Sequence, residues 1–125
     1  MKKTIFAGLA LAVLAVPAFA DGDPEKGAKV FRKCKACHQV GDDAKNRVGP
    51  ILNGIVGSQA GANPEFKYSP ALMKKAEEGL IWDDAALGAF FKKPRDFIPG
   101  TKMSFAGLRK DEEIANLIAY LATQN

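Results

Sequence analysis

The chain has 125 residues, of which 18 are basic and 14 acidic, so its formal net charge is +4. This length accommodates one small domain and not two. Removing the basic residues Lys2 and Lys3 lowers the net charge to +2. So modest a charge gives no reason to expect nucleic-acid binding.

Residues 1–20 have the features of a cleavable export signal. A basic start at Lys2 and Lys3 is followed by an apolar stretch over residues 5–16 and by a small-x-small pattern that ends at Ala20. A membrane anchor is disfavoured, because spanning the hydrocarbon core takes roughly 20 apolar residues. We expect cleavage after Ala20, export to the periplasm and a mature single domain over residues 21–125.

The first helix of the mature chain is expected near its start. Asp23 can cap a helix that has Pro24 in its first position, and the apolar residues that follow continue the pattern to about Cys34. Glycine and proline then recur over residues 39–67, with no sustained helical or alternating pattern. That segment is predicted to be a long loop, which a small domain tolerates when the loop wraps around something.

Three more helices are expected in the second half of the chain. Ser69 begins a short one that ends by Gly79, and either Asp83 or Asp84 caps the next, which ends before Pro94. Residues 95–107 look irregular.

The last helix has the clearest signals. Acidic residues at 111–113 mark its start, and apolar residues recur at helical spacing to Leu121. No segment has the pattern of a strand, so we expect an all-α fold with helices packed around long loops.

The strongest functional signal is the sequence Cys34-Lys35-Ala36-Cys37-His38. C-x-x-C-H is the signature of covalent haem attachment: two thiols add to the haem vinyl groups, and the following histidine ligates the iron. A thioredoxin-like redox pair would need strands around the motif. A zinc site would need further ligands, but His38 is the only histidine and there is no third cysteine. We therefore predict one covalently bound haem c.

The second axial ligand is sought among the remaining side chains. His38 is already used, which leaves Met73, Met103 and, if it loses its proton, a lysine such as Lys102. Met73 lies in a predicted helix, where a packing role suits it. Met103 lies in an irregular segment that can pass over a flat cofactor, so we favour it, in keeping with the use of Met/His ligation in cytochromes c.

Met/His ligation has a functional consequence. It raises the reduction potential and fills both axial positions, which leaves no site for a substrate. We therefore expect a carrier of single electrons and not an enzyme. The alternative is a haem enzyme or sensor, such as a weak peroxidase, in which Met103 leaves the iron.

The mature chain resembles the class I c-type cytochromes, in particular the group that joins bacterial cytochrome c2 to mitochondrial cytochrome c. The resemblance rests on motifs that occur in the same order over nearly the whole mature chain. They are Gly27 and Phe31, Cys34 to His38, Gly49-Pro50, Tyr68-Ser69, Trp82, Pro94, Ile98 to Met103, Phe105 to Gly107 and Leu117 to Leu121. It implies the small cytochrome c fold, with three to five helices and long loops wrapped around one covalent haem.

The resemblance also implies roles for single residues. The carbonyl of Pro50 would orient the His38 ring, and Tyr68 and Trp82 would hydrogen-bond a haem propionate. Thr101 would lie beside Met103, and Phe105 would shield the haem edge. Gly27 and Phe31 would pack against Leu117 and Tyr120 where the terminal helices cross.

Three positions depart from the family pattern. Phe90 stands where many relatives have tyrosine, Leu72 where many have asparagine and Ser58 where many have arginine. Each departure removes a polar or charged group from the haem side, so the family's reduction potential does not carry over to this chain.

The resemblance implies docking through a basic surface near the haem edge. Its candidate residues are Lys33, Lys35, Lys45, Lys92, Lys93, Arg95, Lys102, Arg109 and Lys110, while acidic residues are expected elsewhere, at 77–78, 83–84 and 111–113. Partners would be redox proteins with acidic docking surfaces: a bc1-type complex or a dehydrogenase as donor, and a terminal oxidase or photosynthetic reaction centre as acceptor. The chain would act as a monomer without a membrane anchor, and its association would weaken as salt rises.

Overall fold

The computed structural model describes Gly8 and residues 22–125. The expected export signal at 1–20, Gly8 apart, lies outside the described residues. The helices of the described chain are α1 Pro24–Phe31, α2 Pro70–Glu77, α3 Asp84–Lys92, α4 Pro94–Phe97 and α5 Asp111–Ala122. Within that same part of the chain, pairing of the β type is limited to one isolated bridge between Gln59 and Ile81. The expectation of an all-α fold is confirmed.

Side-chain caps fix where the first three helices begin. The carboxylate of Asp23 accepts hydrogen bonds from the backbone N–H groups of Glu25 and Lys26, and Ser69 accepts one from Leu72. At the start of α3 the cap is Asp83, which accepts from the backbone of Ala86 at 2.8 Å. Each cap satisfies a backbone donor that the first turn of a helix leaves without a partner.

Two expectations about helix boundaries were wrong. α1 ends at Phe31 and not near Cys34, because the N–H groups of Lys33 and Cys34 donate to carbonyls three residues back, at Val30 and Phe31. Such bonds tighten the chain into successive turns. The segment 95–107 is not wholly irregular, since it contains most of α4. Four residues that begin with a proline are too few to show helical periodicity.

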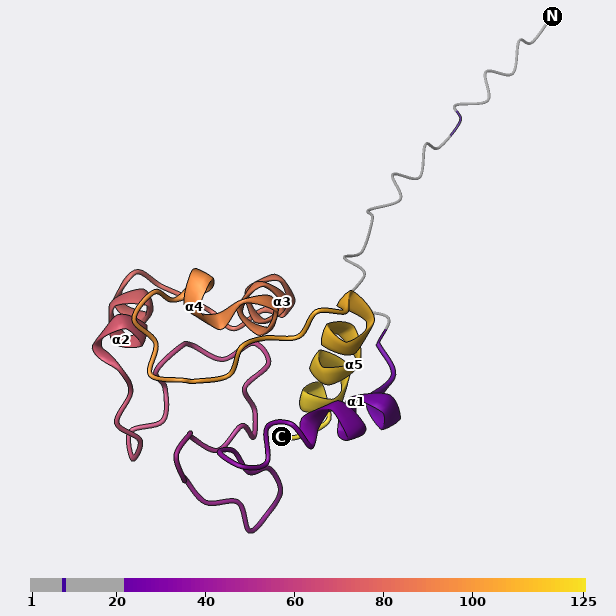
Figure 1. The fold of residues 1–125 in the computed structure, drawn as a ribbon, viewed down its shortest axis with the longest axis horizontal. Helices are drawn as coiled ribbons and strands as arrows, with labels where there is room; N and C mark the ends of the chain where they lie inside the picture. Colours follow the sequence, from indigo (N-terminus) through magenta and orange to yellow (C-terminus); the bar gives the residue numbers. More distant parts are fainter. Residues whose placement is uncertain (1–7, 9–21) are drawn as a thin grey trace, which may run out of the picture.

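The terminal helices α1 and α5 cross at one end of the molecule (Figure 1). Gly27 makes the crossing possible: a Cβ atom there would overlap the backbone carbonyl of Asn116 and the side chain of Tyr120. Phe31 lies beside the same tyrosine, with 5.4 Å between their ring centroids. Leu117 is buried in the same core. The expected crossing is therefore present, and Asn116 is an additional member of it.

A second group of buried side chains lies where α3 and α4 meet the segment before them. Trp82 packs against Phe90 with 5.1 Å between ring centroids, and both rings lie near Phe97. Figure 1 shows α2, α3 and α4 along one side, while the segment after α4 returns past α3 to α5. Within the part of the chain that the structure describes, no helix combines the length and hydropathy needed to span a bilayer.

Candidate functional site

The two cysteines and the histidine of the motif lie in the turns that follow α1. The backbone N–H groups of Cys37 and His38 both donate to the carbonyl of Cys34, at 3.1 and 2.9 Å. These bonds gather the three residues around one turn. Both thiols are free and half-buried, so they are available for thioether bonds.

The environment of Cys34 differs from that of a redox-active thiol. Burial raises the pKa of its thiol to about 11, the neighbouring Cys37 adds to the rise and Lys33 opposes it. Redox cysteine pairs depend on a lowered pKa, since the thiolate is the reactive species. The burial of Cys34 therefore disfavours thiol–disulfide exchange through this thiol.

His38 is held in one orientation by its neighbours. Its Nδ1 lies 2.7 Å from the carbonyl oxygen of Pro50. A carbonyl only accepts hydrogen bonds, so Nδ1 carries the proton and Nε2 keeps the free lone pair. Burial lowers the pKa of His38, with the bond to Pro50 opposing that effect, which favours the neutral ring. His38 is thus a neutral imidazole with Nε2 ready to bind a metal.

Gly49 provides room for that ring. A Cβ atom at this position would overlap the His38 imidazole. The N–H of Gly49 donates to the carbonyl of Cys37 at 2.9 Å, which ties this loop to the motif. The sequence alone predicted no role for Gly49, although its place before Pro50 is part of the resemblance. Only the position of the ring explains why a side chain is excluded.

Met103 lies half-buried in the segment between α4 and α5. Its N–H donates to the hydroxyl oxygen of Thr101 at 3.3 Å, and the N–H of Thr101 donates to the carbonyl of Ile98 at 3.0 Å. The structure thus brings Thr101 and Met103 together. The hydroxyl fixes the backbone from which the thioether extends.

The two alternative ligands have other contacts. The ammonium of Lys102 bonds to the carbonyl of Lys67 and lies 4.4 Å from the centroid of the Phe66 ring. Met73 lies on α2 with 38 % of its surface exposed, and its sulfur is next to Gly61. Both side chains have local roles that explain their positions without a metal.

The aromatic residues expected at the site are placed separately. Tyr68 accepts a hydrogen bond from the backbone of Asn63 at 3.1 Å. Trp82 is 5 % exposed and lies within the buried aromatic group. Phe105 is half-buried against the core. Among the described residues no hydrogen bond joins Tyr68 to Trp82.

The chemistry of the donor set fits a covalently attached haem. It offers an imidazole with a free Nε2, a thioether and two free thiols three positions apart. Cys34 comes from the turns after α1, and Met103 and Phe105 come from the segment between α4 and α5, yet all three pack against the core that contains Trp82. A haem with Met/His ligation uses this combination of one soft and one nitrogen ligand.

The charged surface differs in one respect from expectation. Acidic residues 111–113 are not apart from the basic ones: Lys33 pairs with Glu113 at 3.2 Å, and Lys92 pairs with Asp111 at 3.1 Å. Folding places the start of α5 beside these lysines, which their distance along the sequence could not reveal. Among the described residues, six basic candidates form no ion pair: Lys35, Lys45, Arg95, Lys102, Arg109 and Lys110.

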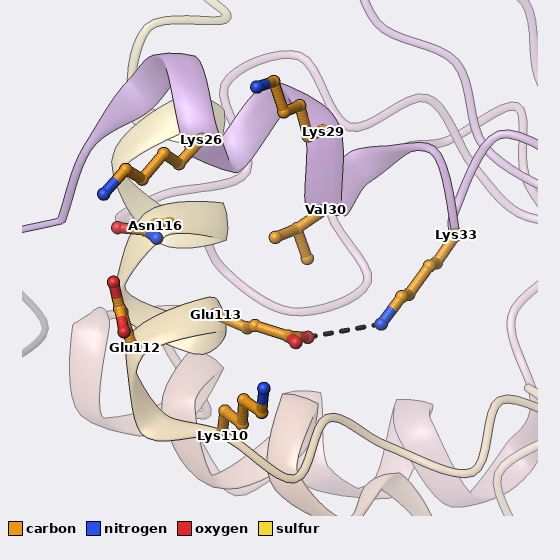
Figure 2. Close-up of a pocket in the computed structure, with 8 residues that line it drawn as sticks. All are labelled: Lys26, Lys29, Val30, Lys33, Lys110, Glu112, Glu113 and Asn116. Carbon is orange, nitrogen blue, oxygen red and sulfur yellow. Dashed lines mark hydrogen bonds and ion pairs between the residues drawn. The ribbon is translucent and has the colours of Figure 1, made fainter.

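A shallow hollow of about 340 Å³ lies between α1 and α5. Figure 2 shows the Lys33–Glu113 pair among the lining residues, with Lys110 pointing towards the same glutamate and Lys26 and Lys29 along α1. Four lysines and two glutamates line the hollow, so it adds positive charge to this face of the molecule. It contains none of the four residues expected to bind haem or iron.

Three comparisons identify relatives of this chain. The family model for cytochrome c matches residues 24–125. Cytochrome c2 of Rhodomicrobium vannielii is 48% identical over 98% of this chain and 95% of its own length. Cytochrome c-554 of Methylosinus trichosporium is 47% identical over 95% of this chain and 88% of its own length.

Solved structures agree with the sequence matches. Cytochrome cH from Methylobacterium extorquens has a TM-score of 0.75 at 42% identity, covering 82% of this chain and all of that one. Cytochrome c2 from Rhodospirillum centenum has a TM-score of 0.78 at 39% identity, covering 82% of this chain and 98% of that one. The match takes in the Cys34–His38 motif, whose spacing fits one covalently bound haem c. The chain belongs to the cytochrome c family, within the class I group of the cytochromes c2, and is a mono-haem electron carrier and not an enzyme.

Proposed function

We propose that Cys34 and Cys37 hold the haem through thioether bonds and that His38 and Met103 are the axial ligands of its iron. The observation that carries this proposal is the contact between His38 Nδ1 and the Pro50 carbonyl. Because Nδ1 is committed as a donor, Nε2 is the nitrogen left for the iron. Once bound, the haem supplies the ferric/ferrous redox couple, which exchanges one electron.

The other site residues control the surroundings of that couple. Thr101 fixes the backbone at Met103. The carbonyl of Pro50 restricts rotation of the His38 ring. Tyr68 and Trp82 donate hydrogen bonds to a propionate, which makes its charge tolerable in a partly buried place. Phe105 covers the haem edge, and a thioether ligand favours the reduced iron.

The physiological role that we propose is a diffusible carrier in the periplasm. The leader is removed after Ala20, and the mature protein over residues 21–125 acts as a monomer. It accepts electrons from a bc1-type complex or a dehydrogenase and delivers them to a terminal oxidase or a photosynthetic reaction centre. Support comes from several relatives named cytochrome c2, one of them 38% identical over the whole chain, in Blastochloris viridis.

Docking on these partners would use the exposed basic residues near the motif. Lys35 and Lys45 are exposed and form no ion pair among the described residues, so their charge is available to an acidic surface. Charge steering of this kind suits brief encounters between small interfaces.

The ligand assignment is tested on the purified mature protein. The pigment is expected to remain with the polypeptide in acidified acetone, and Met103→Leu is expected to abolish the sulfur-to-iron charge-transfer band of the ferric form. Met73→Leu is the matched control, since it removes the other thioether of the mature chain. Loss of the band in Met73→Leu, with retention in Met103→Leu, would overturn the assignment.

The carrier role is tested with membranes from the native organism. They are expected to oxidise the reduced protein, and comparison of light with dark separates a reaction centre from an oxidase as acceptor. Carbon monoxide is expected not to bind the ferrous form, because both axial positions are filled. Ready binding of carbon monoxide, with no oxidation by membranes in either condition, would favour a haem enzyme or sensor instead.

A further inference from the structure

Two long loops are joined by a pair of asparagine side chains. The side-chain oxygen of Asn46 accepts from the side-chain amide of Asn63 and from the backbone N–H of Ile51, both at 2.9 Å. The side-chain oxygen of Asn63 accepts from the backbone of Glu65 at 3.0 Å. Both asparagines are half-buried beside a hollow of about 320 Å³. We call this contact the Asn46–Asn63 bridge.

The bridge connects the two sides of the proposed haem site. At one end it holds Ile51, the residue after Pro50, whose carbonyl orients the His38 ring. At the other end the backbone N–H of Asn63 donates to the hydroxyl oxygen of Tyr68 at 3.1 Å. A chain of hydrogen bonds therefore runs from the loop that orients the ligand to the phenol.

This arrangement determines how Tyr68 can act. A phenol has one proton to donate, and its oxygen here already accepts from Asn63. The hydroxyl is thus free to act as a donor, which is what a carboxylate requires of it. An O–H group becomes a stronger donor when its own oxygen accepts a hydrogen bond. The bond from the Asn63 N–H therefore strengthens donation by the Tyr68 hydroxyl.

We propose that the Asn46–Asn63 bridge is a positioning device that holds the Tyr68 hydroxyl in place as a donor to the haem propionate and so raises the reduction potential. The inference rests on the proposed function, which assigns Tyr68 to a propionate. Neither asparagine touches the haem in this proposal. Both act through Tyr68.

The test compares two asparagines of the same loop. Asn46→Ala removes the bridge. Asn53→Ala is the matched control, since Asn53 also braces the loop with two bonds, to the N–H and carbonyl of Gly41 at 3.1 and 3.0 Å, but makes no bond to the Tyr68 side. Both variants are expected to melt at lower temperature. Only Asn46→Ala is expected to lower the midpoint potential. It is also expected to speed hydrogen exchange at the backbone N–H of Asn63 by about tenfold, the effect of one lost hydrogen bond.

A double-mutant cycle with Tyr68→Phe separates positioning from general loosening. The potential shift of Asn46→Ala is expected to disappear in the Tyr68→Phe background, because the group through which it acts is gone. An undiminished shift in that background, or an equal shift in Asn53→Ala, would overturn the proposal. Asn63→Ala breaks the bridge from its other end and must give the same shift, which keeps the test decisive if Asn46→Ala does not fold. If the protein carried no covalent pigment at all, the proposed function would fail and no potential could be measured.

Discussion

Gly49 lies against the His38 ring at a position where any side chain would overlap the imidazole. Gly49→Ala is therefore expected to displace the ring from the Pro50 carbonyl and to lower the free energy of unfolding by about 1–3 kcal/mol, the usual cost of overpacking. Guanidinium titration of the haem-bound protein measures this loss. The neighbouring residue Val48 is 74 % exposed, so Val48→Ala serves as the control and is expected to change stability by no more than about 0.5 kcal/mol. Equal stability of the two variants would contradict the role of Gly49.

Thr101 offers a second test at the scale of one residue. Its hydroxyl oxygen accepts from the N–H of Met103, so Thr101→Val keeps the shape and removes the acceptor. We expect a loss of about 0.5–1.5 kcal/mol in stability and a weaker sulfur-to-iron charge-transfer band, because the ligand segment is less well held.

The control for this substitution is Thr123→Val. Thr123 also uses its hydroxyl in a local bond, to the carbonyl of Tyr120 at 2.6 Å, but it follows α5 and lies outside the Met103 segment. Stability is expected to fall in both variants, whereas the band is expected to weaken only in Thr101→Val. A weakened band in Thr123→Val as well would show that the band reports general stability and not the contact at Met103.

At the scale of helices and loops, the crossing of α1 and α5 depends on close approach of their backbones at Gly27. Alanine favours an isolated helix over glycine by about 1 kcal/mol. In this chain, however, the added Cβ would overlap the carbonyl of Asn116, so Gly27→Ala is expected to lower stability by about 2–4 kcal/mol as the helices separate. Thermal unfolding measures the effect. Lys29→Ala, on the exposed side of the same helix, is the control and is expected to be nearly neutral.

The elements that sequence reasoning located best are those whose ends are set by local chemistry. Ser69 caps α2 as expected, and Asp83 is the one of the two acidic candidates that caps α3; a capping side chain bonds to the backbone two or three residues ahead, so the signal is local. α4 escaped prediction, since a single turn shows no periodicity. The end of α1 was misplaced because the turns after Phe31 still bond to carbonyls three residues back.

Features that depend on contacts distant in sequence could not be predicted. The donor set at Cys34 and His38 was evident from spacing alone, but the overlap at Gly49 requires the position of a ring eleven residues earlier. The Asn46–Asn63 bridge likewise joins two loops that have no periodic pattern. Such contacts are fixed by the fold and have no local signature in the sequence.

At the scale of the whole molecule, the distribution of charge governs association. The net charge is small, yet within residues 22–125 folding leaves some lysines in ion pairs and others without one. Exposed ion pairs such as Lys33–Glu113 contribute little to stability. They do lower the local positive potential that an approaching partner meets. The lysines close to the motif that form no ion pair should therefore dominate steering. A count of charges in the sequence could not separate them from the paired lysines.

This difference predicts unequal effects of two substitutions that change the net charge equally. Lys35→Gln removes an unpaired charge within the Cys34–His38 motif, whereas Lys74→Gln removes one on α2, away from α1 in Figure 1. At 0.1 M salt, Lys35→Gln is expected to slow association with an acidic redox partner severalfold, and Lys74→Gln to leave it nearly unchanged, since screening limits steering to about 10 Å at that ionic strength. Stopped-flow oxidation of the reduced protein by native membranes, repeated as salt is raised, measures both rates.

The rate of the unmodified protein should fall towards that of Lys35→Gln as screening grows. A rate that is flat from low to high salt would show that these lysines do not steer the encounter, and equal losses in the two variants would show that net charge, and not its position beside the motif, controls association.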